Sequence, residues 1–566
     1  MKLMNENAHR TPPHENRTAM SSAPPLPHRL LLLLMLAIVW FSLLGYRDLI
    51  EPDEGRYAEI PLEMFATGDW LTPHLNGFLY FEKPPLQYWA TAIFYQLFGV
   101  DNLTSRLWVA LTGFFGILWT LHVGNRLFGT TAGWNAALIL ASMLLYCALG
   151  HFNTLDMATG VWIFLGIGAL LLAQQERTTH PIRCRNHMLL AWTALAGATL
   201  SKGLIGLLIP GSTLVLYTLW QRDWTLWRHM HLGKGLLLFF ALTTPWFVLV
   251  SLKNPDFAQF FFIHEHFDRY ATASHSRPGP WYYFIGVLLA GTLPWTGRVL
   301  SALRQPGFPW YRGQGNFDPV RLLWVYDLFI LFFFSLSHSK LIPYIIPMFP
   351  ALALLAGRHL AESPGKTPFV WEIRALGVLV VLSLLATVSS ELLANPTHPV
   401  SMILQLRPWL LGAAATLSLA MLAAWRLPTT TALLVMPILS VLGFQWLTWG
   451  AQELSATKSS REAVNAIAAH VPPDTPVYAI DAYFQSLPFY WRHTVIVVNF
   501  QGELEFGITR NPDRWIGDSH VFASRWMQSD QAVAVFNRDN FPSWQERQLP
   551  MKIIHQDGKR VVVIRR

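Results

Sequence analysis

Long apolar runs constrain the fold of this 566-residue chain more than any other feature. A helix that crosses a bilayer needs about 20 mostly apolar residues, and the chain holds about thirteen such runs. Because only 13% of its residues are charged, it is predicted to be an α-helical polytopic membrane protein. The predicted spans are 29–46, 106–127, 131–150, 155–175, 187–200, 203–220, 233–252, 281–300, 322–336, 341–356, 369–392, 407–424 and 429–449.

The distribution of lysine and arginine predicts the orientation of these spans. Cytoplasmic connections carry an excess of positive charge, and alternate connections of this chain do so, as at Arg126, Arg177 and Arg222. The N-terminus is therefore predicted to be cytoplasmic, with residues 1–28 as a disordered polar leader. The same topology accounts for the net charge of +8, so no nucleic-acid partner is expected.

Three segments are then predicted to lie on the outer side of the membrane. The transmembrane domain covers residues 29–450, and its long outer loops are 47–105 and 253–280. Residues 451–566 follow the last span, with alternating strand-like stretches separated by helical ones. They are predicted to form a soluble α/β domain without a nucleotide-binding fingerprint.

The first outer loop opens with "EPDEGRYAEIPLEMFATGDW". Its apolar residues recur at helical spacing, which predicts an amphipathic helix on the membrane surface. Asp53, Glu54 and Arg56 stand at the start of this helix, followed by Tyr57. In one interpretation these charges cap the helix and face water; in the other they face a substrate.

The same loop returns toward the membrane with "YFEKPPLQYW", which puts Glu82 and Lys83 between aromatic rings, just after Tyr80. At the depth of the lipid headgroups, burying a carboxylate without a cationic partner costs free energy, whereas a lysine can bind a lipid phosphate. Lys83 is thus either a snorkelling anchor or a ligand for a substrate phosphate.

The second outer loop contains "FFFIHEHFDRY". The guanidinium of Arg269 can hold two phosphate oxygens at once, which suits a phosphate clamp. His264 and His266, together with Glu82, offer ligands for a divalent metal ion, although a His-x-His pattern in a loop is weak support for a metal site.

Shorter outer connections add candidates for a substrate cavity. Asp156 begins the fourth span, where it serves either the helix N-terminus or a substrate. Lys202 stands in a tight turn, and Lys340 and Tyr344 lie beside proline-interrupted helix starts, where backbone groups are left free to bind. These groups all gather on the outer face, which favours an exterior reaction on a phospholipid-like substrate.

The sequence resembles the aminoarabinose transferases of bacterial lipid A modification, integral-membrane glycosyltransferases of the GT-C class that are related to protein O-mannosyltransferases. The resemblance rests on "EPDEGRYAEIPLEMFATGDWLTPHLNGFLYFEKPPLQYW", "LDMATG", "SKGLIG", "FFFIHEHFDRY", "SRPGPWYY" and "KLIPYI". It runs in order through the membrane portion, and the outer soluble domain fits it as well. It implies a multi-pass protein of the bacterial inner membrane, with its active site and C-terminal domain in the periplasm.

The resemblance implies transfer of aminoarabinose from undecaprenyl phosphate to a phosphate group of lipid A, which confers resistance to cationic antimicrobial peptides such as polymyxin. We expect a monomer and no required cofactor. On the family pattern, Asp53 corresponds to the catalytic carboxylate, and Lys83, Arg269 and Tyr344 correspond to donor-phosphate ligands. We expect the substrate cavity to be lined by Arg56, Tyr57, Tyr80, Glu82, Asp156, Lys202, His264 and Lys340.

The chemistry supports these roles independently. Negative charge grows on a polyprenyl phosphate as the glycosidic bond breaks, so a fixed cation such as Lys83 stabilises the transition state more than the ground state. A carboxylate on the other side of the sugar can accept a proton, orient the acceptor or stabilise oxocarbenium-like charge. Asp53 is the first candidate for that role and Glu54 the second.

Other functions fit parts of the sequence. A related enzyme that takes a hexose from polyprenyl phosphate to a protein, glycan or other lipid would share the same motifs. A transporter of lipid-linked sugars would show inverted repeats and polar groups at mid-membrane, which the sequence does not display. A ligand sensor would not need charged groups on several separate outer loops.

Overall fold

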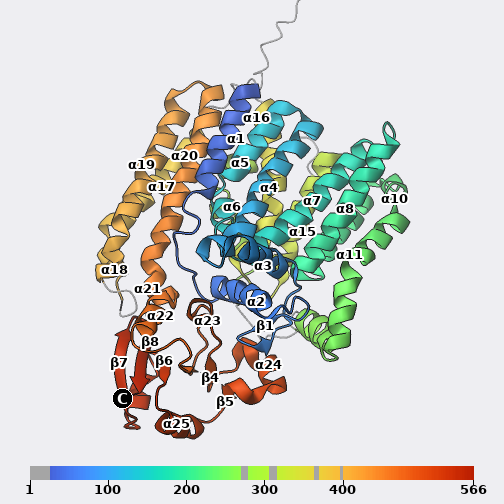
Figure 1. Ribbon diagram of the computed structural model, residues 1–566. Coiled ribbons are helices and arrows are strands. Elements are labelled where there is room, and N and C mark those ends of the chain that lie inside the picture. The colour runs from blue at the N-terminus through green and yellow to red at the C-terminus, as the bar shows by residue number, and fades with distance from the viewer. Residues whose placement is uncertain (1–25, 269–277, 305–314, 363–368, 396–399, 566) are drawn as a thin grey trace, which may run out of the picture.

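The computed structural model describes residues 26–268, 278–304, 315–362, 369–395 and 400–565. It consists of a body of long helices and a smaller C-terminal domain built on a β-sheet (Figure 1). The predicted leader lies almost wholly outside the described residues, as does Arg269. The predicted fold class, a helical membrane protein with a C-terminal α/β domain, is confirmed.

Eight described helices are long and apolar enough to cross a membrane, and each matches a predicted span. A helix suits such a segment because it satisfies its backbone polar groups internally. The eight are α4 (Asn102–Phe128), α7 (Leu155–Gln175), α11 (Leu232–Lys253), α15 (Pro319–Leu336), α16 with the 3-10 turn η2 (Ile342–Glu362), α17 (Val370–Val388), α19 with α18 (Val400–Arg426) and α20 with η4 (Thr429–Leu454).

One further predicted span is a bent pair of helices, α13 (Tyr283–Gly291) and α14 (Thr296–Ala302), which meet at 113°. The remaining predicted spans fall on helices that are shorter, broken or more polar, so the count of thirteen stays a prediction. These helices are α1 (Leu26–Phe41), α5 (Thr130–Ala141) with α6 (Leu144–Leu149), α8 (Pro181–Lys202) and α9 (Ile205–Gln221).

The core of the helical body lies around α7, of whose apolar stretch 89% is buried. Small residues let the surrounding helices approach closely. A Cβ on Gly124 of α4 would lie only 2.6 Å from the Cα of Gly133 of α5, so even a methyl group would force these two helices apart. Asp156 stands in the first turn of α7, and Lys202 is the last residue of α8.

The first outer loop forms α2 (Asp53–Thr67), a hairpin of β1 (His74–Leu75) and β2 (Phe78–Leu79), and α3 (Leu86–Phe98). The predicted amphipathic helix is present as α2, but it does not lie on an open membrane surface. It packs between α3 and the C-terminal domain instead (Figure 1). Gly55 permits this contact, because a Cβ there would lie 2.6 Å from the backbone nitrogen of Ser486.

The C-terminal domain is built on a six-stranded sheet in the order β5-β4-β3-β6-β8-β7. Strands β3 to β6 run parallel, whereas β8 and β7 add an antiparallel edge. The strands are β3 (Val477–Ile480), β4 (Ile496–Val498), β5 (Trp515–Ile516), β6 (Val533–Asn537), β7 (Met551–Gln556) and β8 (Arg560–Arg565). The helices around them are α22 (Arg461–Ala468), α23 (Leu487–Trp491), α24 (Glu505–Arg510), α25 (Ser519–Gln528) and α26 (Phe541–Gln545).

A buried polar network joins this domain to the first outer loop. Glu51 accepts hydrogen bonds at 2.7 Å from Arg560 Nη2 and from the hydroxyl groups of Ser460 and Ser486. Burial alone would raise the pKa of Glu51, but the cations of Arg560 and Lys559 outweigh it and hold this pKa at about 2. The network fixes the C-terminal domain at the end of the helical body that carries α2 (Figure 1).

Candidate active site

A lysine-containing pocket opens where the outer loops meet the ends of the membrane helices. This lysine pocket has a volume of about 220 Å³, and its lining includes Glu82, Lys83, Lys202, Glu265 and Tyr344. These residues come from the first outer loop, α8, the π-helix η1 (Gln259–Asp268) and η2. The fold thus gathers four segments, far apart in the sequence, around one set of charges.

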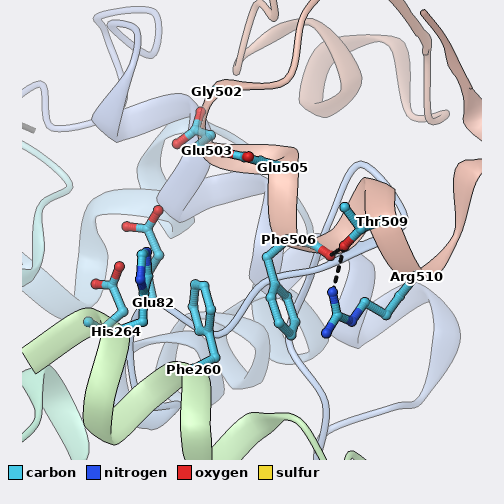
Figure 2. A pocket seen from close by; sticks show the side chains of 10 residues that line it. Glu82, Phe260, His264, Gly502, Glu503, Glu505, Phe506, Thr509 and Arg510 are labelled. Carbon is cyan, nitrogen blue, oxygen red and sulfur yellow. Dashed lines mark hydrogen bonds between the residues drawn. The ribbon is translucent and has the colours of Figure 1, made fainter. Parts of the chain in front are cut away.

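A second pocket, the glutamate pocket, has a volume of about 290 Å³ and shares Glu82 and Glu265 with the first. Figure 2 shows that Glu82 and His264 lie close together on one side of it. The C-terminal domain supplies the opposite side, with Glu503 of the 3-10 turn η5 (Gly502–Leu504) and residues of α24. The glutamate pocket therefore exists only because this domain is docked on the outer loops.

Lys83 is held by carboxylates at the boundary of the two pockets. Its Nζ lies 3.2 Å from Glu265 Oε2 and 3.8 Å from Glu82 Oε2, and it donates a hydrogen bond to the Glu82 carbonyl at 2.8 Å. The Lys83 side chain is 15% exposed, so it is largely desolvated but still reaches the pocket. Of the two predicted roles, this position favours a substrate ligand over a lipid anchor.

Lys202 is the second cation of the lysine pocket. It forms an ion pair with Asp156, at the first turn of α7, and its Nζ lies 4.9 Å from the centre of the Tyr344 ring. Asp156, Lys202 and Tyr344 were each predicted as site residues from separate stretches of sequence, and the structure brings them together.

Asp53 is linked to the glutamate pocket through one arginine. Asp53 Oδ1 lies 3.4 Å from Arg56 Nη1, and Arg56 Nη2 lies 2.5 Å from Glu503 Oε2. The Asp53 side chain is 49% exposed, whereas Arg56 and Glu503 are largely buried. Asp53 is thus accessible to a substrate, and its contact with the largely buried Arg56 holds its carboxylate in place.

Glu54 has different surroundings from its neighbour in sequence. It is buried and is bound by Arg106 Nε at 2.7 Å, by Arg47 Nη1 at 3.3 Å and by the backbone N–H of Asn153 at 3.0 Å. Burial would raise the pKa of Glu54, but the two guanidinium groups bring it down to about 2. This geometry favours a structural role for Glu54 and leaves Asp53 as the candidate catalytic carboxylate.

Two predicted cavity tyrosines lie behind the pockets. Tyr57 stacks against Tyr88 with ring centres 6.3 Å apart. Burial raises the pKa of Tyr57, and the carboxylates of Asp53 and Glu82 raise it further. The hydroxyl of Tyr80 is buried and makes no hydrogen bond with any residue in the part of the chain that the structure describes. Both phenols are therefore neutral groups in the wall of the site.

The predicted metal ligands Glu82 and His264 both line the glutamate pocket. His264 packs against Phe260 of the same π-helix, with ring centres 5.3 Å apart. Within the described side chains, no three His, Cys, Asp or Glu residues are placed to hold a metal ion, and the side chain of His266 lies outside them. The metal site stays a prediction.

Lys340 lies beside the lysine pocket, next to its lining residues Ser337 and Ser339. Its Nζ donates hydrogen bonds to the carbonyls of Ser335 and Ser337 at 2.9 and 2.6 Å, and so satisfies the end of α15. Burial lowers the pKa of Lys340. It does not belong to the lining of either pocket, and these contacts favour a structural role.

Sequence reasoning missed Glu265 and Glu503 as site residues. Glu265 was visible as the acidic residue between two histidines, at the position that a π-helix turns toward Lys83. No sequence pattern marked Glu503 as a site residue, because it stands in an ordinary polar stretch of the C-terminal domain, which was predicted to be separate from the transmembrane domain.

Known proteins are similar to this chain in both sequence and fold. Residues 27–261 match the family described as dolichyl-phosphate-mannose-protein mannosyltransferase, and residues 463–565 match the aminoarabinose transferase C-terminal domain. The crystal structure of ArnT from Cupriavidus metallidurans bound to undecaprenyl phosphate is similar with a TM-score of 0.85, at 34% identity, over 95% of this chain and 98% of that chain. The fold and site therefore define a membrane glycosyltransferase of the GT-C class that uses a lipid-linked sugar.

Relatives narrow this class to one family. The undecaprenyl phosphate-alpha-4-amino-4-deoxy-L-arabinose arabinosyl transferase of Erwinia tasmaniensis is 31% identical over 69% of this chain and 70% of its own length. The protein of the same name from Pseudomonas paraeruginosa is 33% identical over 70% of this chain and 71% of its own length. The chain belongs to this family of arabinosyl transferases, which confirms the resemblance seen in the sequence.

Proposed function

We propose that this protein transfers 4-amino-4-deoxy-L-arabinose from undecaprenyl phosphate to a phosphate group of lipid A, at the periplasmic face of the bacterial inner membrane. The observation that carries the proposal is the lysine pocket, where Lys83, Lys202 and Tyr344 meet at the ends of membrane helices. The name shared by the relatives and the undecaprenyl phosphate bound to the related ArnT support it. Adding an ammonium group to lipid A lowers its net negative charge, and so weakens binding of cationic peptides such as polymyxin.

The donor phosphate is proposed to bind in the lysine pocket. When the bond between the sugar C1 and the phosphate oxygen breaks, the electron pair stays on that oxygen. Lys83 and Lys202 stabilise this growing charge, and the Tyr344 hydroxyl donates to it, so these interactions strengthen in the transition state. Phe333 and Phe334 of α15 line the same pocket and offer apolar surface to the isoprenoid chain.

Asp53 is proposed to act on the acceptor side. A phosphate monoester has a second pKa of about 6, so the acceptor oxygen is already largely ionised at neutral pH and needs little deprotonation. The main task of Asp53 is then to orient the acceptor and to stabilise positive charge at C1. Its link through Arg56 to Glu503 restricts where its carboxylate lies.

The carboxylates of the glutamate pocket favour an amino sugar over a neutral hexose. Its lining contains Glu82, Glu265, Glu503 and Glu505. An ammonium group gains from nearby carboxylates in a partly desolvated site, whereas a hydroxyl group gains much less. This contrast is the structural basis on which we prefer aminoarabinose to a hexose as the transferred sugar.

The proposed reaction has no step that needs a cofactor, because fixed cations of the chain stabilise the leaving phosphate. If a divalent ion binds, Glu82 and His264 are the described residues that would hold it. Transfer measured in the presence of EDTA tests this directly: an unchanged rate is expected, and a loss that zinc or magnesium restores would establish a metal requirement.

The decisive experiment is transfer by the purified protein in nanodiscs. Undecaprenyl-phosphate aminoarabinose and lipid A are supplied, and the product is read by its mass increment. We expect product with the wild type and none above background with Asp53→Asn at preserved folding. Product only from an undecaprenyl-phosphate hexose would assign a different sugar, and uptake of a lipid-linked sugar without any transfer would indicate a transporter.

A further inference from the structure

Each lysine of the lysine pocket has a carboxylate directly beside it. Lys83 Nζ lies 3.2 Å from Glu265 Oε2, and Lys202 forms an ion pair with Asp156. The side chains are only partly accessible, with exposed fractions of 5% for Glu265 and 15% for Asp156. Within the described residues, the two lysines of the pocket are therefore each matched by a negative charge on the protein.

This pairing matters because the phosphate changes its charge during the reaction. In the donor proposed above, the phosphate is a diester with a single negative charge. After transfer it is a monoester, which carries about −1.5 to −2 at neutral pH. Coulomb attraction scales with charge, so two uncompensated lysines would hold the spent carrier more tightly than the fresh donor.

The two acids are placed to counter this effect. Glu265 is held on the π-helix η1 and Asp156 on the first turn of α7, so the two acids come from separate elements and each reaches one lysine. Glu82 is a weaker partner for Lys83, because its carboxylate oxygen lies at 3.8 Å. A like-charged group close to the bound phosphate disfavours the more highly charged form.

We propose that Glu265 and Asp156 are internal counter-ions of Lys83 and Lys202 that set the preference of the pocket between phosphodiester and phosphomonoester headgroups. This inference rests on the proposed function. As negative charge grows on the leaving phosphate, each lysine is drawn toward it. Once the carrier departs, each lysine returns to its carboxylate, so the acids favour release of the product.

The test measures binding of two probes to the full-length protein in nanodiscs. One probe is undecaprenyl phosphate, a monoester, and the other is undecaprenyl methyl phosphate, a diester. The variants are Glu265→Gln and Asp156→Asn, which remove the charge but keep the shape of the side chain. Asp256→Asn is the matched control: it removes an exposed carboxylate that pairs with Arg510, at 3.0 Å, near the start of the same π-helix.

The informative quantity is the ratio of the diester Kd to the monoester Kd. We expect this ratio to rise up to about five-fold in Glu265→Gln and in Asp156→Asn, and to stay at the wild-type value in Asp256→Asn. A role in merely orienting the lysines predicts instead that both probes bind more weakly with an unchanged ratio, and that result would overturn the proposal. If one of the two variants does not fold, the Kd ratio of the other variant tests the proposal.

The same measurement separates the inference from the function on which it rests. A wild type that binds neither probe would overturn the assignment of the donor, and the inference with it. A wild type that binds both probes, with an unchanged ratio in the folded variants, would remove the counter-ion role and leave the proposed function standing.

Discussion

Arg56 Nη2 of α2 lies 2.5 Å from Glu503 Oε2 of the C-terminal domain, and both side chains are largely buried. The same arginine contacts Asp53 Oδ1 at 3.4 Å. The C-terminal domain thus supplies the partner of the arginine that stands next to the proposed catalytic carboxylate. The C-terminal domain is therefore a component of the candidate site.

Replacing Glu503 by Gln should therefore damage both stability and turnover. The change removes the closer and more buried of the two carboxylates that contact Arg56 and leaves only the half-exposed Asp53, at 3.4 Å, to balance its charge. Loss of one partner of a largely buried pair is destabilising. We expect a lower Tm by differential scanning and a slower transfer rate. Glu462→Gln, on an exposed face of α22, is the control and should change neither quantity. Wild-type Tm and rate in Glu503→Gln would contradict this role.

Lys83→Ala should lower the transfer rate by about 10²- to 10³-fold, since it removes a fixed charge from the position of the leaving phosphate. Lys253→Ala is a suitable control, because Lys253 also pairs with a carboxylate, Asp69, but is 51% exposed. The rate of that control should stay within about two-fold of the wild type, as for most exposed pairs. Equal effects of the two substitutions would argue against a phosphate ligand at Lys83.

The adjacent carboxylates Asp53 and Glu54 should respond in opposite ways to loss of charge. Asp53→Asn should reduce transfer to background and leave Tm nearly unchanged, since the side chain is half exposed. Glu54→Gln should lower Tm strongly, because Arg47 and Arg106 would lose their common partner. Thermal melts and rates on the two purified variants check this. A stable but inactive Glu54→Gln protein would reverse the assignment.

The stability of the protein should depend on pH through Glu63 of α2, which binds the turn of the β1–β2 hairpin. Both carboxylate oxygens of Glu63 accept from the Gly77 N–H at 3.0 Å, and burial raises the pKa of this carboxyl to about 7. Because the folded state holds the proton more tightly than an unfolded chain with a pKa near 4.3, the stabilisation is complete below pH 4.3. It is lost as the pH rises toward 7.

We accordingly expect the Tm of the wild type to fall between pH 5 and pH 8. Glu63→Gln, which mimics the protonated form, should show a smaller fall over the same range. Glu51 and Glu54 do not contribute there, since each has a pKa of about 2 and stays charged. Identical pH profiles for Glu63→Gln and the wild type would show that Glu63 does not titrate in this range.

The sequence by itself determined the class of the fold and most of the candidate site. Apolar runs of the length of a bilayer dictate membrane helices in any packing arrangement, and the amphipathic pattern of 53–67 dictates a helix. The loop sequences also identified Lys83 and Asp156 as candidate site residues, because ionisable groups near a membrane surface usually have a charged partner or a function.

Only the tertiary structure decided how these residues are used. Asp53 and Glu54 look alike in sequence, yet one is half exposed and the other is buried between two arginines. Lys83 meets Glu265 across 182 positions of the chain, and Arg56 meets Glu503 of a separate domain. Contacts of this kind depend on how helices and domains pack against one another. The spacing of residues along the sequence does not predict them.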